Sequence, residues 1–194
     1  MKTLMVLTFV MITLNFTPCR CQVTSSGGVE NLRSDYKKVS KDNAKRMLRQ
    51  KGLFDKYWNK SGGFKNEFES MSVGREKVII DHMTRLMWHP SGSFKMMNLK
   101  EARQWIVDLN KKCYAGYFDW RLPTLEEAAS LLENSRQKNL YIDRAFDRRQ
   151  WCIWTGNTLS PHLAWFVVFS GRIGWFEKNV RMNYVRPVRS LSKS

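Results

Sequence analysis

The stretch FDWRLPTLEEAASLL, at residues 118–132, constrains the fold more than any other part of the chain. Pro123 restricts Leu122 to an extended conformation, so a helix can begin only after it. Thr124 then fits an N-cap, and Glu127, three residues later, completes a capping box. The sequence therefore predicts an extended segment that enters a short helix at a fixed angle.

Side chains alternate along such an extended segment. Trp120 and Leu122 point to one side, which we expect to be the core. Arg121 points to the other side, where the carboxylate of Asp119 or a backbone carbonyl is expected to hold it. These residues are therefore predicted to be a fold signature and not a catalytic motif. The signature consists of Trp120, Arg121, Leu122, Pro123 and Thr124.

Two further helices carry similar start signals. Ser40 fits the N-cap of a basic helix that Gly52 can end. Asn98 fits the N-cap of another, with Glu101 completing a capping box and an end near Lys111. Short aromatic and β-branched runs predict strands elsewhere. They form a hairpin within residues 76–89 and strands at residues 151–155, 163–169, 172–177 and 184–190, the last at a sheet edge.

The first 21 residues have the pattern of a secretory signal peptide. Lys2 precedes an apolar run that is too short to span a bilayer, and small residues follow it. We therefore expect an exported protein that is periplasmic, exposed on the cell surface or secreted, without a stable membrane span. The chain divides into a signal peptide (1–21), a flexible leader (22–30), a basic helical extension (31–69), a globular domain (70–190) and a tail (191–194).

Loss of the signal peptide leaves two cysteines, Cys113 and Cys152. An even number of cysteines in an oxidising compartment predicts one disulfide between them. Two free thiols are the alternative, which the sequence leaves open.

Charge is the strongest compositional signal. The chain has 33 Lys and Arg against 17 Asp and Glu, and removal of Lys2 and Arg20 lowers the net charge from +16 to +14. Such a field favours anionic partners, among which export disfavours nucleic acid. High net charge also aids solubility, so it need not indicate a ligand.

Several motifs in fixed order carry a resemblance to a known family. They are TRLMWHPSGS, AGYFDWRLPTLEEAASLLE, YIDRAFD, WCIWT, AWFVVFSGRIGWF and YVRPVRS. Residues 78–190 resemble the Lcl C-terminal domain family, named for a bacterial collagen-like adhesin. The RLPT motif is also distantly similar to formylglycine-generating and sulfatase-modifying domains, which are C-type-lectin-like. The resemblance implies an α+β, C-type-lectin-like fold with two helices flanking a twisted antiparallel sheet.

Catalytic patterns are scarce in the sequence. The three histidines, His82, His89 and His162, lie far apart and form no zinc-binding spacing. Cys113 precedes the RLPT motif, unlike the cysteine pair of the formylglycine-generating enzymes. We therefore predict a protein that is not an enzyme and needs no cofactor or metal.

A binding surface fits the last hairpin and loop better. Cations beside aromatic rings suit anionic sugars, and members of the resembled family bind sulfated polysaccharides. The candidate ligand-binding residues are Arg172, Trp175, Lys178, Arg181, Asn183 and Tyr184. The alternative is that the aromatic residues belong to the core and that the cations are solvated surface.

The sequence thus predicts an exported recognition domain for an acidic glycan, sulfated or carboxylated, or for a cell-surface partner. One alternative is a structural subunit of an envelope assembly that docks through the basic helix at residues 40–50. A modifying enzyme related to the formylglycine-generating enzymes is a further alternative. The sequence leaves oligomerisation open.

Overall fold

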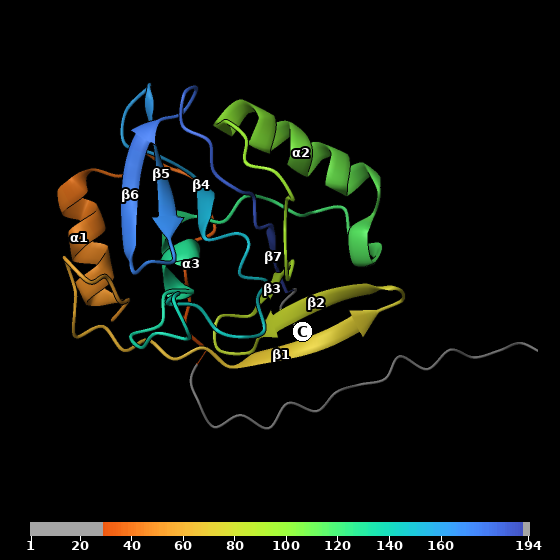
Figure 1. The fold of residues 1–194 in the computed structure, drawn as a ribbon, viewed down its shortest axis with the longest axis horizontal. Helices are drawn as coiled ribbons and strands as arrows, with labels where there is room; N and C mark the ends of the chain where they lie inside the picture. The colour runs from red at the N-terminus through yellow and green to blue at the C-terminus, as the bar shows by residue number, and fades with distance from the viewer. Residues whose placement is uncertain (1–28, 192–194) are drawn as a thin grey trace, which may run out of the picture.

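A computed structural model describes residues 29–191 as an α+β fold with two antiparallel sheets (Figure 1). The predicted signal peptide, most of the predicted leader and the last three residues lie outside the described residues. Within residues 29–191, no helix has the length and apolar character needed to cross a membrane.

The two sheets are the main departure from the expected architecture, which had one. The first sheet has the strand order β1-β2-β3-β7, and the second has the order β4-β5-β6. The strands are β1 (Phe68–Val73), β2 (Glu76–Asp81), β3 (Leu86–Trp88), β4 (Cys152–Thr158), β5 (Leu163–Val168), β6 (Arg172–Glu177) and β7 (Val188–Ser190). The helices are α1 (Lys41–Gln50), α2 (Leu99–Lys111) and α3 (Leu125–Ser130), with a short 3-10 turn at Tyr114–Gly116.

The division into two sheets was not predicted, because it depends on a pairing between strands that are far apart in the sequence. β7 does not join the sheet of β4, β5 and β6, which precede it in the chain, but pairs with β3, where Val188 lies opposite Trp88. Residues Phe68–Val73 were not predicted as a strand, because their side chains are exposed or only half-buried and give a weak apolar alternation. The predicted hairpin within residues 76–89 is confirmed by the β2–β3 pairing.

The helix starts follow the predicted caps. The Ser40 side chain accepts a hydrogen bond from the Asn43 amide, and Gly52 has a positive φ of 63° after the end of α1. Capping boxes are present at α2, between Asn98 and Glu101, and at α3. Local hydrogen bonds of this kind depend on residues three positions apart, so they can be predicted from the sequence.

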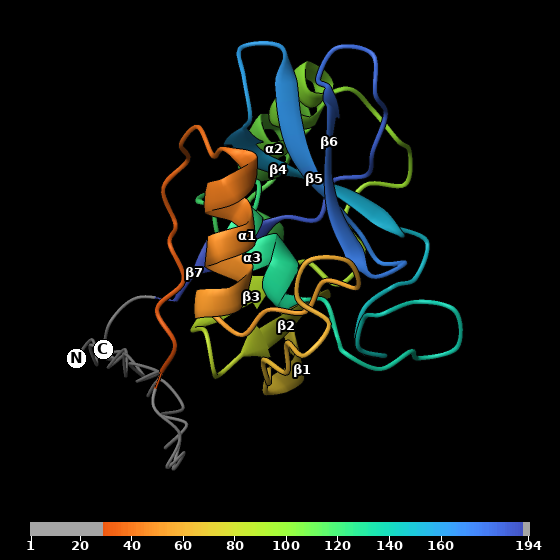
Figure 2. The same cartoon turned by 90° about the vertical axis from the view of Figure 1, so that its left-hand side faces the viewer.

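Side chains alternate between two packed layers on either side of the β4–β5–β6 sheet. Ile153, Trp165 and Val167 face a core cluster that also contains buried residues of α1 and α3. Their neighbours Trp154 and Phe166 face a second cluster, which contains buried residues of α2. The basic helix α1 therefore packs into the main core, beside α3 (Figure 2).

The fold signature joins several distant segments. Arg121 pairs through its backbone with Val188 of β7, and the Pro123 carbonyl accepts a hydrogen bond from Gly156 in β4. Trp120 and Leu122 are buried, as predicted. The motif thus ties both sheets to the start of α3.

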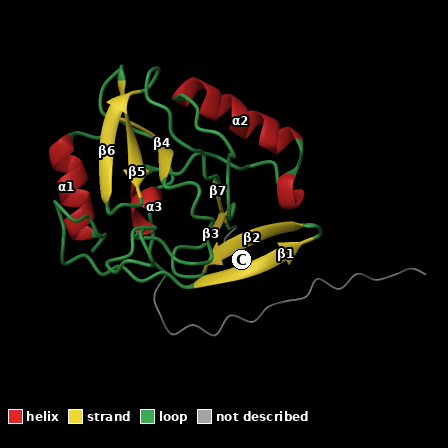
Figure 3. Ribbon diagram, viewed as in Figure 1, coloured by secondary structure: helices red, strands yellow, loops and turns green. Residues whose placement is uncertain are grey.

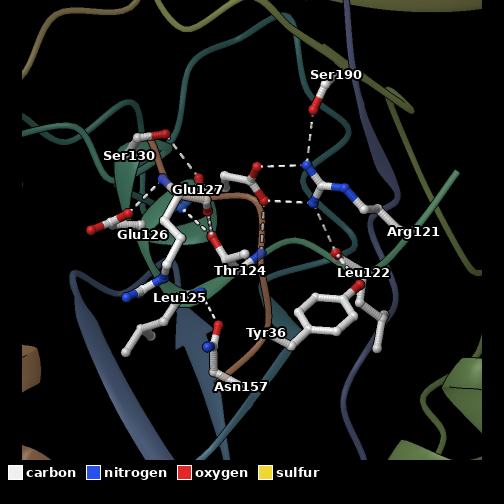
Figure 4. A network of polar contacts seen from close by, with 11 residues as sticks. Tyr36, Arg121, Leu122, Thr124, Leu125, Glu126, Glu127, Ser130, Asn157 and Ser190 are labelled. Carbon is white, nitrogen blue, oxygen red and sulfur yellow. Dashed lines mark hydrogen bonds and ion pairs between the residues drawn. The ribbon is translucent and has the colours of Figure 1, made fainter. Parts of the chain in front are cut away.

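Arg121 is held by a carboxylate that was not predicted, in addition to a backbone carbonyl, which was one of the two expected partners. Its two terminal nitrogens each donate to a carboxylate oxygen of Glu127 at 2.7 Å, and one also donates to the Leu122 carbonyl at 3.3 Å (Figure 4). The expected partner Asp119 instead accepts hydrogen bonds from Arg189. Burial lowers the pKa of Arg121, but the hydrogen bond and charge of Glu127 outweigh this effect and leave the pKa raised.

The segment before α1 covers this network. The Tyr36 hydroxyl donates to the Leu122 carbonyl at 2.7 Å (Figure 4). The Thr124 hydroxyl donates to the Arg33 carbonyl at 2.8 Å. Asn157 of β4 donates to the Lys37 carbonyl at 2.9 Å. The segment that precedes α1 is therefore fixed to the signature through Arg33 and Tyr36, and to β4 through Lys37.

Candidate functional site

A groove of about 610 Å³ runs beside β6, the edge strand of the three-stranded sheet. Aromatic rings make up much of its lining, and two arginines stand among them. The aromatic residues are Tyr57, Trp58, Phe166, Trp175 and Phe176, and the cations are Arg172 and Arg181. The groove thus combines apolar ring surface with positive charge, which suits a ligand that has both apolar faces and anionic groups.

Asp55 fixes the loop that forms one wall. One carboxylate oxygen accepts hydrogen bonds from the Tyr57 and Trp58 amides, each at 2.9 Å. The other oxygen accepts from the Ile173 amide of β6 at 2.8 Å. Because Asp55 is buried and its carboxylate is engaged with backbone amides, it positions the loop against the strand.

Three tryptophans pack together at the groove, and two of them, Trp58 and Trp175, line it. Trp58 stacks on Trp175 with ring centroids 6.0 Å apart and an interplanar angle of 22°. Buried Trp165 meets both rings edge-on, at centroid distances of 6.4 Å and 5.3 Å. This packing holds Trp58 and Trp175 in fixed orientations.

Two lysines of α1 lie over this pair of rings. The Lys41 ammonium is 4.2 Å from the Trp175 ring centroid, and the Lys45 ammonium is 5.2 Å from the Trp58 centroid. The two lysines are four positions apart in the sequence, so they project from the same side of the helix. The rings therefore hold two cations beside the groove through cation–π interactions.

Arg181 is positioned by a buried amide. Its Nε donates to the Asn183 side-chain oxygen at 3.3 Å, and its guanidinium lies 5.0 Å from the Phe166 ring centroid. Asn183 itself is fully buried and pairs through its backbone with Met97. Arg181 can present its remaining N–H groups to the groove, and Asn183 acts through it.

A comparison with known protein families finds a match for the part of the chain that contains β6. The model of the Lcl C-terminal domain family matches residues 77–189, more than half of the 194-residue chain. The chain belongs to the Lcl C-terminal domain family. No curated protein matches the chain.

The groove is built from two parts of the chain. Residues of β5, β6 and the following loop lie within the matched Lcl domain. Asp55, Tyr57 and Trp58 also line the groove but precede the matched range, as do Lys41 and Lys45, which lie over two of the lining rings. The N-terminal segment thus completes a wall of the groove that the Lcl domain alone would leave open.

The Lcl domain brings together three of the six predicted ligand-binding residues. Arg172, Trp175 and Arg181 line the groove. Lys178 instead lines a separate hollow beside Lys100 and Arg103 of α2. Asn183 supports Arg181 from inside, and Tyr184 packs partly buried against both core clusters.

Sequence reasoning missed the residues outside the Lcl domain. The segment at residues 40–50 was predicted as a basic helix, but none of the residues before the Lcl domain was among the predicted ligand-binding residues. Trp58 does pack against the core, whereas Tyr57 is 61% exposed. The sequence does not show that these residues lie beside β6, because their position depends on a long-range contact, the hydrogen bond from the Ile173 amide to the Asp55 carboxylate.

The histidines of the Lcl domain do not converge on a reactive site. His82 pairs with Glu69, and His89 stacks on Tyr114 with ring centroids 4.3 Å apart. Burial, with a smaller contribution from the charge of Arg186, lowers the pKa of His89 to about 4. Over residues 29–191, no three His, Cys, Asp or Glu side chains gather as metal ligands would.

The predicted disulfide of the Lcl domain is wrong for this structure. Cys113 is an exposed free thiol after the end of α2, and Cys152 is a buried free thiol in β4. The prediction used only the even number of cysteines, which does not show that one lies at the surface and the other in the core. Burial raises the pKa of Cys152 to about 11, which keeps this thiol protonated and unreactive.

We expect one cysteine to react in the folded protein. Without reductant, a thiol reagent should modify Cys113 rapidly and Cys152 only after unfolding, because the buried thiol is screened from solvent. Mass spectrometry of peptides from native and denatured samples would locate each modification. If neither cysteine reacts even in denaturant, while both react after reduction, the two form a disulfide.

Proposed function

We propose that this chain is an exported, non-enzymatic recognition domain that binds an acidic glycan in the groove beside β6. Its signal-peptide pattern supports export, and its membership of the Lcl C-terminal domain family supports an adhesin-like, extracellular role. A C-type-lectin-like ancestry of the domain is part of this proposal. The ligand is a sugar polymer or oligomer that carries sulfate or carboxylate groups.

The observation that carries the proposal is the pair of lysines held over two packed tryptophans. A lysine on a flexible stem loses side-chain entropy when it binds an anion. Here the contacts with Trp175 and Trp58 already confine the two ammonium groups. Less entropy remains to be lost on binding, which favours an anionic group placed between Lys41 and Lys45.

Two of the rings that line the groove offer exposed surface to the apolar faces of a sugar. Tyr57 is 61% exposed and Phe176 is 47% exposed, so both rings have free surface. Trp58 and Trp175 are only partly exposed, and their faces meet each other or the lysines. We therefore assign ring stacking to Tyr57 and Phe176, and anion contacts to the lysines and to Arg172 and Arg181.

The assignment predicts that removing the two ring-bound lysines weakens glycan binding. Lys41→Ala with Lys45→Ala should lower the affinity for dextran sulfate or polygalacturonate by about tenfold or more, as expected for lost charge-assisted contacts. Titration calorimetry at physiological salt would measure this change, with uncharged dextran as the negative ligand. Arg172→Ala should weaken binding in the same direction.

The same helix provides a matched control. Arg46→Ala with Arg49→Ala removes the same charge from exposed positions of α1 that make no cation–π contact with Trp58 or Trp175. This variant should change the affinity by less than about twofold at physiological salt, since exposed charges are screened. An equal loss in both double variants would show that binding follows net charge and would refute the groove.

A further inference from the structure

A second group of cations lies in the long irregular segment between α3 and β4 (Figure 3). A pocket of about 410 Å³ in this segment is lined by Gln137, Lys138, Arg144 and Arg148. Three of these four residues are cationic, and none is acidic. None of them lines the groove beside β6, so the pocket is a separate feature.

One residue holds both arginines of this pocket. Arg144 Nε donates to the Gln137 side-chain oxygen at 3.3 Å, and Arg148 donates through Nη2 to the Gln137 backbone carbonyl. Each guanidinium keeps further N–H groups that these bonds do not use. Gln137 therefore aligns two forked donors around the same space, with part of their conformational freedom already lost.

Two of the three carboxylates of the same segment, those of Asp143 and Asp147, accept hydrogen bonds from nearby backbone amides. Asp143 accepts a hydrogen bond from the Ala145 amide at 2.7 Å, and Asp147 accepts from the Arg149 amide at 2.9 Å. Among the described residues, no ion pair involves Lys138, Arg144 or Arg148. The positive charge of the pocket is therefore left without a protein counter-ion.

Lys138 occupies a backbone conformation that disfavours it. It has a positive φ of 59° in the tight turn between Gln137 and Leu140, whose backbone groups pair with each other. Glycine or asparagine is the usual residue at such a position, because a Cβ makes the left-handed region costly. A lysine there accepts strain and places an additional cation beside the two arginines, as strained positions at binding sites do.

The segment is anchored to the rest of the fold. The Tyr141 amide donates to the Phe169 carbonyl at 2.7 Å, and buried Arg186 donates to the Asp147 carbonyl at 2.8 Å. Phe54 stacks on Tyr141 with ring centroids 5.3 Å apart. The pocket is therefore carried on a fixed framework, which favours binding over a mobile basic loop.

We propose that the pocket formed by Gln137, Lys138, Arg144 and Arg148 is a second binding site, specific for a tetrahedral oxyanion. A sulfate or phosphate group, free or as a monoester, matches two arginine forks and a lysine. The site is independent of the groove and of the glycan that the groove binds.

Titration calorimetry with inorganic sulfate, inorganic phosphate and methyl sulfate tests the proposal and separates free ions from a monoester. Arg144→Ala and Arg148→Ala should each lower the affinity by about tenfold, the factor expected for one charge-assisted hydrogen bond. Arg75→Ala, which removes one charge from the exposed β1–β2 turn, should leave the affinity unchanged. Repeating these titrations in a Lys41→Ala, Lys45→Ala background removes the anion contacts proposed for the groove, so that the affinity measured is that of the pocket.

Lys138→Gly separates a binding role from a structural one. Glycine accommodates the positive φ, so the melting temperature should stay the same or rise, while the affinity for sulfate falls several-fold. The pocket is refuted if the wild-type protein binds none of the three anions. It is also refuted if Arg75→Ala weakens binding as much as Arg148→Ala, or if Lys138→Gly binds sulfate as tightly as the wild type.

Discussion

Replacing Arg121 with Ala is expected to lower the free energy of unfolding by about 3–5 kcal/mol, the cost of breaking a buried ion pair from one side. Glu127 has a fully buried side chain, and the two hydrogen bonds from Arg121 at 2.7 Å match its carboxylate. Without Arg121, the carboxylate keeps its hydrogen bond from the Thr124 amide but loses its counter-charge. Urea denaturation followed by circular dichroism would measure the loss.

Two variants show whether the pairing itself causes this loss. Arg103→Ala removes an exposed arginine from α2 and should change the free energy of unfolding by less than about 0.5 kcal/mol. Arg121→Met combined with Glu127→Leu removes both charges and should recover part of the stability lost in Arg121→Ala. A cost below about 1 kcal/mol for Arg121→Ala would contradict the structural role of the pair.

Asp55→Ala is the second substitution with a large expected effect, because it should damage both stability and binding. It removes the acceptor of three backbone amides and separates the loop of Trp58 from β6. We expect a loss of about 2–4 kcal/mol in the free energy of unfolding, from buried amides left without a partner. Glycan affinity should fall as well, since Trp58 would no longer be held against Trp175.

The matched control is Asp143→Ala, which removes a carboxylate that accepts one local hydrogen bond, from Ala145. That variant should cost about 1 kcal/mol and leave glycan affinity unchanged. Thermal unfolding and calorimetry at a temperature where both variants are folded would compare them. Normal glycan affinity in folded Asp55→Ala would show that the groove does not need this loop.

The local parts of the fold were predictable from the sequence. The capping residues Ser40, Asn98 and Thr124 each marked a helix start within one residue, because cap and helix are neighbours in the chain. The turn at Gly171, with a φ of 103°, lies between the strands predicted at residues 163–169 and 172–177. By contrast, the return of β7 to β3 depends on a pairing about 100 residues apart, which no local pattern encodes.

Only part of the candidate site could be predicted, because the other part depends on contacts between residues far apart in the sequence. Arg172, Trp175 and Arg181 could be proposed from a cation-rich, aromatic hairpin. Asp55 could not be, because its partner Ile173 is 118 residues away. Arg121 shows a related limit: Glu127 had already been assigned to the capping box, yet its carboxylate serves both the cap and the guanidinium.

The central claim is that the protein selects an acidic glycan by structure and not by its net charge of +16 alone. Binding of the purified protein to an array of sulfated, carboxylated and neutral glycans, at low and at physiological salt, tests this claim most directly. We predict that a distinct sulfated or carboxylated set is retained at physiological salt. Uniform binding to every anionic glycan at low salt, lost entirely at physiological salt, would contradict the claim.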